Sequence, residues 1–136
     1  MKREDLIAAA ESMIGTPFHA QGRKRGVGLD CIGLVACSAR QAGFVFQDQS
    51  AYPMRPNGAL QPVLEHYMTR VGASELAPGD VLLMAFNGME PHHVALYMGD
   101  GQIIHAYTQA RKTVKQTYSK YWQEKTVAVY RFPEIE

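Results

Sequence analysis

Cys31, His93 and His105 are the residues whose types and spacing could perform covalent chemistry. Cys31 lies in the segment GLDCIGLV, at residues 28–35, directly after Asp30. A thiol attacks as its thiolate, and a free cysteine with a pKa of about 8.5 is only a few per cent ionised at neutral pH. A helix amino terminus and a neighbouring imidazolium both lower that pKa. Asp30 is a preferred N-cap residue, so the segment predicts a helix that begins at Cys31, with the sulfur at its positive end. Gly28 and Gly33 are expected to leave room for a bound peptide backbone.

His93 and His105 lie in a predicted β-hairpin at residues 92–107, which turns around Gly99-Asp100-Gly101. A three-residue loop with a left-handed last glycine would place Ala95 opposite His105. The two imidazoles would then be diagonal neighbours on one face of the hairpin. A two-residue loop would instead place them on opposite faces. In the first arrangement His93 takes or shares the thiol proton, and His105 fixes the tautomer of His93.

The elements that must position these residues are helices followed by strands. Apolar spacings of three and four predict helices, alternating runs predict strands, and Gly15 and Gly43 are expected to end the first two helices. This order indicates an α+β fold with an antiparallel sheet. The predicted elements are a helix at 3–14, a turn-rich loop at 15–28, a helix from Cys31, a surface loop at 44–62, a short helix at 64–72, and strands at 81–86, 92–107, 113–118 and 126–132, with a turn at 119–125.

Length and composition indicate one globular domain over residues 1–136. The hydrophobic fraction is 46% and the charged fraction 20%, as in ordinary folded domains. A net charge of +1 provides no field that would recruit nucleic acid or an anionic membrane. No apolar stretch approaches the ~20 residues of a membrane span. Residues 1–15 are expected to form an amphipathic helix and no signal peptide, because Glu11 and Ser12 interrupt the apolar run.

The two cysteines, Cys31 and Cys37, do not suggest a disulfide or a zinc site. They are six residues apart on one predicted helix and would face different sides of it. No CxxC or HExxH motif accompanies the histidines, so no metal is expected. Cys37 is interpreted as a small buried residue.

Five short motifs then occur in the order typical of a known family. They are GTPF at 15–18, DCIGLV at 30–35, LAPGD at 76–80, HVALYMGDG at 93–101 and IIHA at 103–106. With these motifs the chain resembles the NlpC/P60 family of papain-like cysteine peptidases. The resemblance implies a papain-like α+β fold with N-terminal helices packed on an antiparallel sheet.

The family's functional residues carry over to three positions of this chain. The resemblance implies Cys31 as the nucleophile, His93 as the general base and His105 as the third polar residue, with no cofactor. It also implies hydrolysis of cell-wall stem peptides, commonly next to a D-isoglutamyl unit, through an acyl-enzyme.

Two positions depart from the family's pattern. Ile32 stands where a serine usually follows the nucleophile, and Phe18 stands where the G-x-P-Y tyrosine lies beside it. The D-C-I-G-L variant most resembles small hydrolases associated with phage tails. That resemblance implies synthesis in the host cytoplasm, a place in the virion tail, action at the cell wall after delivery, and tail-tip proteins as further partners.

Candidates for substrate contacts come from the segments around these motifs. Arg23, in the basic loop GRKRG, could meet carboxylates of a wall peptide, as could Lys24. The others are Phe18, His19, Asp30 and Tyr52, with Arg55 a weaker candidate. His66 and His92 are interpreted as surface residues, and Trp122 as core packing.

Three alternatives remain open. The chain could be a wall amidase delivered by a secretion system. It could be an acyltransferase on the same scaffold, although it lacks an evident apolar anchor. It could also be a non-catalytic tail-tip or adaptor module, which Phe18 and Ile32 favour because they replace polar residues.

Overall fold

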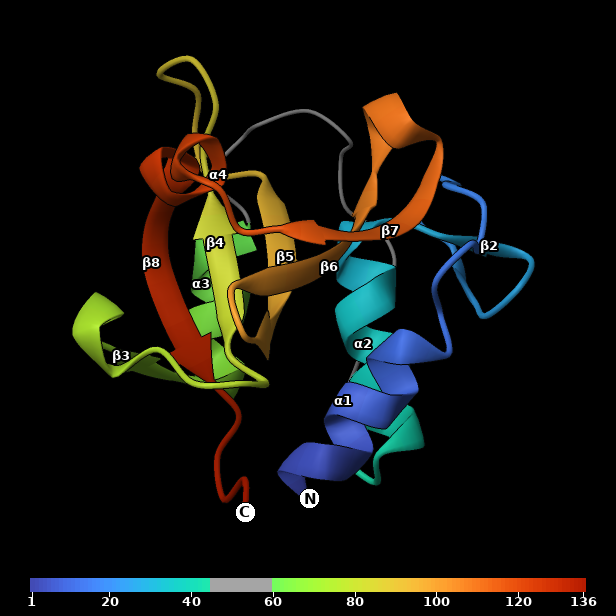
Figure 1. Cartoon of the computed structure of the whole chain (residues 1–136), viewed down its shortest axis with the longest axis horizontal. Coiled ribbons are helices and arrows are strands. Elements are labelled where there is room, and N and C mark those ends of the chain that lie inside the picture. The colour runs from blue at the N-terminus through green and yellow to red at the C-terminus, as the bar shows by residue number, and fades with distance from the viewer. Residues whose placement is uncertain (45–59) are drawn as a thin grey trace.

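A computed structural model describes residues 1–44 and 60–136 (Figure 1). Helices α1 and α2 precede the strands of the main sheet, as predicted. Helix α1 spans Arg3–Glu11, and α2 spans Cys31–Gln41. Helix α1 ends earlier than predicted, because residues 12–15 form turns that lead to Gly15 at φ +89°. Gly43 follows α2 with φ +97°, a conformation that glycine adopts without strain.

A six-stranded antiparallel sheet packs against these helices, which confirms the predicted α+β class. Its order is β3-β8-β4-β5-β6-β7. The strands are β3 Thr69–Val71, β4 Val81–Met84, β5 His93–Gly99, β6 Gln102–Tyr107, β7 Lys112–Thr117 and β8 Thr126–Arg131.

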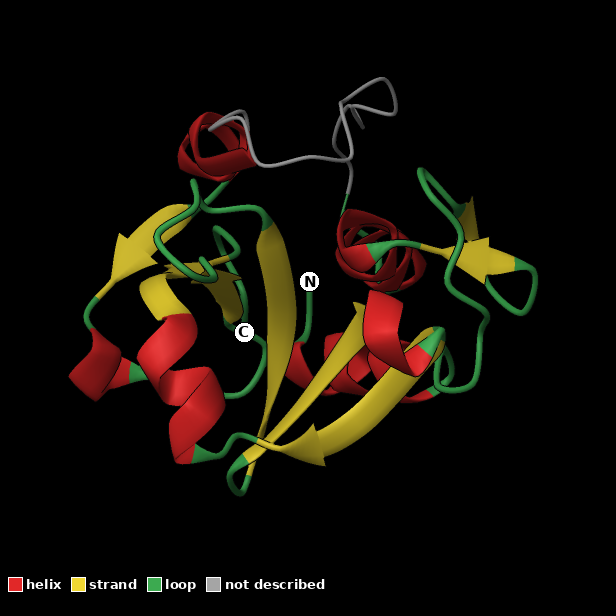
Figure 2. Ribbon diagram, turned by 90° about the horizontal axis from the view of Figure 1, so that it is seen from above, coloured by secondary structure: helices red, strands yellow, loops and turns green. Residues whose placement is uncertain are grey.

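Both faces of the sheet are covered (Figure 2). On one face α1 and α2 pack against alternate strand residues, including Leu83, Val94 and Ile104. On the other face, helix α4 (Lys120–Lys125) contributes Trp122 to a second cluster with Leu82 and other buried residues. Strand β4 is therefore buried on both sides, which explains its unbroken apolar sequence.

Two predicted elements differ from the structure. Helix α3 spans Leu60–Tyr67, not 64–72, and Pro62 fits within its first turn, where no backbone N–H is needed. Residues 69–71 form an edge strand that pairs with β8. The predicted turn at 119–125 contains α4. The predicted surface loop lies mostly outside the described residues.

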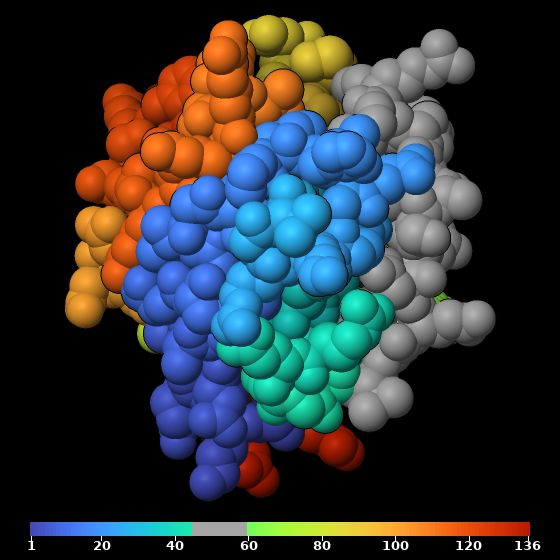
Figure 3. Space-filling model, turned by 90° about the vertical axis from the view of Figure 1, so that its right-hand side faces the viewer, coloured from blue at the N-terminus to red at the C-terminus, as the bar shows by residue number. Residues whose placement is uncertain are grey.

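The loop before α2 is more ordered than predicted. It contains a small hairpin, with β1 at Arg23–Lys24 and β2 at Gly28–Leu29. The segment ahead of it joins the sheet edge, since the Phe18 N–H donates to the Arg111 carbonyl at 2.8 Å. Figure 3 shows this N-terminal part of the chain lying against the β7 region.

The LAPGD turn fixes the sheet near β8. Asp80 is fully buried and accepts from Nε of Arg131 at 2.8 Å and from the Ala77 N–H at 2.9 Å. A buried carboxylate with a charged partner and a backbone donor is well compensated. This motif therefore has a structural role.

The two ends of the chain lie together. The Arg3 N–H donates to the Glu136 carbonyl at 2.8 Å, and the Glu136 N–H donates to the Met1 carbonyl at 3.0 Å. In Figure 1 both ends lie at the bottom, whereas α4 and the turn between β6 and β7 lie at the top.

Candidate active site

Helix α2 begins as the sequence predicts, with Asp30 as N-cap and Cys31 as the first helical residue. Oδ1 of Asp30 accepts from the Gly33 N–H at 2.7 Å. The same carboxylate accepts from the Gln21 N–H at 2.9 Å and from a guanidinium nitrogen of Arg23 at 3.0 Å. These contacts fix the first turn of α2 and join it to the preceding loop.

Gly33 lets that loop approach the helix closely. A Cβ at Gly33 would lie 2.0 Å from the Gly22 carbonyl oxygen, and a Cβ at Gly28 would lie 2.7 Å from Cβ of His19. The expectation from sequence was that these glycines leave room for a bound peptide backbone. That expectation is wrong, because the protein's own loop fills the space.

The Cys31 thiol lies against the beginning of β5. The pKa of this thiol is raised to about 12, chiefly by burial and next by the neighbouring Asp30 carboxylate. Hydrogen bonds from the backbone N–H groups of Val94, Ile32 and Cys31 oppose the rise. The prediction of a lowered pKa is therefore wrong: desolvation outweighs the helix terminus, and the resting thiol is neutral.

His93 and His105 form a buried, hydrogen-bonded pair. Nε2 of His93 lies 2.8 Å from Nδ1 of His105, and His105 is fully buried. Burial lowers the pKa of His93 well below its usual value, and repulsion by His105 and His92 lowers it further. Burial also lowers the pKa of His105. Both imidazoles are accordingly neutral at pH 7.

The hairpin brings the two rings to one face, as predicted, but through a different turn. Asp100 and Gly101 form a two-residue turn with φ of +52° and +70°, closed by the pair Gly99–Gln102. A β-bulge between Tyr97 and Gly99 then shifts the register, so that the next pairs match those of the predicted three-residue loop. The bulge therefore decides the face on which His105 lies.

Gln116 completes this group of side chains and was not among the residues predicted from the sequence. Its Oε1 lies 3.0 Å from Nε2 of His105. In the pairing of β6 with β7, Gln116 is opposite Ile103, which makes it a diagonal neighbour of His105 on the same face. The alternation of residues 112–117 was the available signal, but it needed the register with β6.

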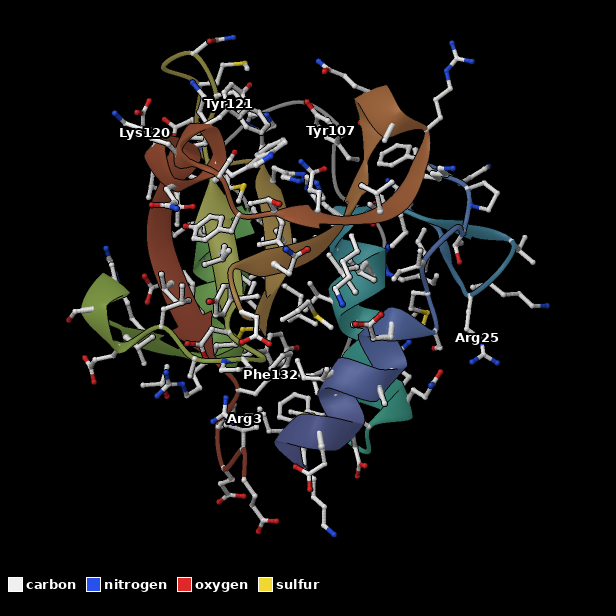
Figure 4. The ribbon with its side chains drawn as sticks, viewed as in Figure 1. Arg3, Arg25, Tyr107, Lys120, Tyr121 and Phe132 are labelled. Carbon is white, nitrogen blue, oxygen red and sulfur yellow. The ribbon has the colours of Figure 1, made fainter. Side chains whose placement is uncertain are left out.

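Aromatic rings surround the histidine pair. Tyr107 stacks on His105 with centroids 5.0 Å apart and planes 8° apart, and Trp122 meets the same ring edge-on at 4.9 Å. Phe86 lies 5.8 Å from His93. Trp122 is core packing, as predicted, but it also contacts a candidate catalytic ring. In Figure 4, Tyr121 lies on α4, and Tyr107 lies at the end of β6.

The thiol and the imidazoles come from two sides of β5. Cys31 packs with the cluster under α2, whereas His93 contacts Phe86 and Tyr107 of the other cluster. The beginning of β5 is common to both, because Val94 contacts the sulfur and directly follows His93.

The predicted substrate contacts fall into different surroundings. Phe18 is partly buried, and His19 is exposed on the loop before α2. Asp30 and Arg23 are bound to each other, and Asp30 is buried. Tyr52, with Arg55, lies outside the described residues.

Cys37 is half-buried, whereas it was interpreted as buried; His92 is also half-buried, and His66 is exposed as predicted. The Cys37 thiol donates to the Arg23 carbonyl at 3.0 Å. His92 contacts the Glu90 carbonyl, and His66 is exposed on α3. Within residues 1–44 and 60–136 no set of three or more metal-ligating side chains gathers. Over those same ranges, no helix has the length and apolar character to cross a bilayer.

Comparisons with known proteins identify relatives of this chain. The model of the NlpC/P60 family matches residues 15–131. Over 62 residues, 46% of this chain and 31% of the relative, the chain is 36% identical to tail tip assembly protein K of Escherichia phage lambda. Over 126 residues, 88% of this chain and 27% of the relative, it is 29% identical to gamma-DL-glutamyl hydrolase of Bacillus subtilis. The chain thus spans less than a third of the length of each of these two relatives.

Solved structures share the fold. An NlpC/P60 family protein from Bacillus cereus superposes with a TM-score of 0.73 at 24% identity, covering 96% of this chain and 40% of that one. RipD of Mycobacterium tuberculosis superposes with a TM-score of 0.65 at 21% identity, with 95% of each chain covered. RipD is described as a non-catalytic NlpC/p60 domain protein adapted to peptidoglycan binding.

Proposed function

This chain belongs to the NlpC/P60 family of cysteine peptidases, and we propose that it hydrolyses amide bonds in the stem peptides of peptidoglycan, with Cys31 as the nucleophile. One observation carries the proposal. A helix capped by Asp30 begins at Cys31 and abuts the strand that carries His93, which is paired with His105 in a buried site. A thiol with an imidazole and an orienting group is the arrangement of nucleophilic catalysis.

The neutral thiol determines how the first step proceeds. Sγ of Cys31 attacks the amide carbonyl carbon while its proton passes to His93, as occurs with the hydroxyl of serine hydrolases. The oxyanion of the tetrahedral intermediate accepts hydrogen bonds from backbone N–H groups near the sulfur, those of Cys31 and Ile32 being the candidates.

The second half regenerates the thiol. Protonated His93 gives its proton to the leaving amine, and the C–N bond breaks to form a thioester. His93 then accepts a proton from water, whose oxygen attacks the thioester carbonyl. The carboxylic acid is released, and the proton returns to Cys31.

Digestion of purified peptidoglycan tests this function. We expect mass spectrometry to find pairs of fragments whose masses add up to that of the intact stem peptide plus one water, with a new carboxylate on one fragment and a new amine on the other. Their masses identify that bond. If the protein sediments with the wall but releases no such fragment, the chain is an adaptor module, and the enzymatic proposal is wrong.

We further propose that the chain is part of a phage tail. This proposal is supported by the 36% identity to the phage lambda tail tip protein over 62 residues. We propose that the chain acts on the wall during penetration, with tail-tip proteins as partners. A lambda phage whose protein K carries this chain in place of its matching segment should form plaques, and the Cys31→Ala version should form fewer. Equal plaque numbers would exclude this role.

We also propose that residues 1–136 fold as one domain. The two buried clusters occupy opposite faces of one sheet and share its strands. A single calorimetric transition, with equal calorimetric and van't Hoff enthalpies, is the expected result.

A further inference from the structure

We propose that Gln116 is a positioning residue that sets the direction of the hydrogen bonds through His105 and His93, so that His93 offers a proton-free Nδ1 to its reaction partner. The catalytic consequence rests on the function proposed above. The tautomers themselves do not depend on it.

Gln116 accepts a hydrogen bond at the outer end of this group of side chains. Its Oε1 lies 3.0 Å from Nε2 of His105, and a carboxamide oxygen can only accept. Nε2 of His105 therefore carries the hydrogen. A neutral imidazole has a single N–H, so Nδ1 of His105 has none and must act as an acceptor.

His93 is the donor in the hydrogen bond to His105. Its Nε2 lies 2.8 Å from the proton-free Nδ1 of His105, so this nitrogen is the donor. Nδ1 of His93 is then the unprotonated nitrogen, and it is the one that can receive the thiol proton. If both hydrogen bonds ran in the opposite direction, Nδ1 of His93 would carry the hydrogen, and His93 could not act as the base.

The surroundings hold His105 in this orientation. Tyr107 stacks on its face at 5.0 Å, and Trp122 packs edge-on at 4.9 Å. A half-turn of the buried ring would exchange its two nitrogens and break both hydrogen bonds. Because the rings restrict this rotation, Gln116 need only supply the acceptor that selects one tautomer.

Histidine nitrogen NMR tests the tautomers directly. In the protein labelled with ¹⁵N-histidine, we expect both His93 and His105 to be Nε2–H tautomers near pH 7. Gln116→Glu keeps an oxygen acceptor and should retain these tautomers and kcat within a few-fold. Gln116→Met has a similar shape without the amide oxygen, and it should give mixed tautomers.

The kinetics of the same variants give a second readout. Loss of an outer partner that orients a metal-bound imidazole costs about 10–100-fold in activity, and we expect an effect of the same size for the imidazole of a catalytic His. We expect that decrease in kcat for Gln116→Met with KM little changed. The matched control is Thr117→Leu, the next residue of β7 on the exposed face, which should alter neither readout.

Each outcome decides the proposal. An Nδ1–H tautomer of His93 in the unmodified protein overturns it, as does a Gln116→Met protein with unchanged tautomers and kcat. Equal losses in the Glu and Met variants also overturn it, because Glu keeps the acceptor. If the unmodified protein does not cleave peptidoglycan, the proposed function fails, but the tautomers still decide the role of Gln116. If the Met variant does not fold, the unmodified protein and Gln116→Glu decide it.

Discussion

The carboxylate of Asp30 both holds the helix that carries Cys31 and raises the pKa of the Cys31 thiol. These effects oppose each other in the proposed reaction. The cap fixes the position of the sulfur, whereas the negative charge disfavours its thiolate. Arg23 lies 3.0 Å from the same carboxylate and compensates part of that charge. The site is thus built for precise placement of a neutral thiol.

Replacement of the proposed nucleophile is the first prediction. Cys31→Ala should reduce hydrolysis of peptidoglycan by about 10⁴-fold or more, because the covalent step is lost. The thermal unfolding midpoint should change little, since the substitution removes a single sulfur atom from a residue that is not fully buried. Cys37→Ala is the matched control on the same helix and should keep most of the activity. Residual hydrolysis by the Cys31 variant at the rate of the control would contradict the assignment.

The reactivity of the thiol should follow its raised pKa. In the Cys37→Ala protein, iodoacetamide should label Cys31 slowly at pH 8.5 and progressively faster as the pH rises, because burial raises the pKa to about 12. The urea-unfolded protein, in which an ordinary thiol titrates near 8.5, provides the comparison. A labelling midpoint below pH 8.5 in the folded protein would show that its thiolate is stabilised.

The buried histidine pair should make folding sensitive to acid. Burial lowers the pKa of His93 and His105 in the folded protein, so the unfolded chain binds more protons below pH 6.5. Stability should therefore be complete above that pH and fall as the pH drops below it. The melting temperature measured from pH 7.5 to 4.5 should show this decrease.

A double variant, His93→Gln with His105→Gln, should flatten that pH dependence. His66→Gln is the control, because His66 is exposed on α3 and should leave the profile as it is. An unchanged slope in the double variant would assign the acid sensitivity to other groups.

The close approach of Gly22 and Gly33 predicts a cost for a single methyl group. Gly33→Ala would place Cβ 2.0 Å from a backbone oxygen, and it should lower the free energy of unfolding by roughly 1–3 kcal/mol. It should also lower kcat, since the first turn of α2 must shift. Gly72→Ala is the control, because its Cβ would meet only the ends of the Glu75 and Ser74 side chains, at 3.2 Å and 3.9 Å. Urea titration of both variants measures the difference.

The parts of the site that follow from local rules could be predicted from the sequence. Asp30 and Cys31 carry a capping signal that needs no distant contact, and the structure confirms it. The alternation along β5 and β6 indicated that His93 and His105 share a face. That inference was right although the loop was not, because a bulge replaced the expected extra loop residue.

The parts that depend on packing could not be predicted. The pKa of Cys31 is set by what covers the sulfur, and a helix-terminus argument contains no information about burial. Gln116 required the pairing of β7 with β6, which depends on the turn at Thr108–Ala110. Gly33 could be read as space for a ligand or for the protein itself, and only the fold distinguishes these.

The paired ends of the chain have a practical consequence. Met1 and Glu136 are hydrogen-bonded to each other, and in Figure 1 they lie at the bottom, away from α4 and the beginning of β5. A polypeptide joined to either end would therefore leave the molecule from the same part of its surface. Tethering at that spot, to a carrier protein or a solid support, would leave the approach to the sulfur unobstructed. It would also let both ends be linked through a short spacer and the chain reopened at an exposed turn elsewhere.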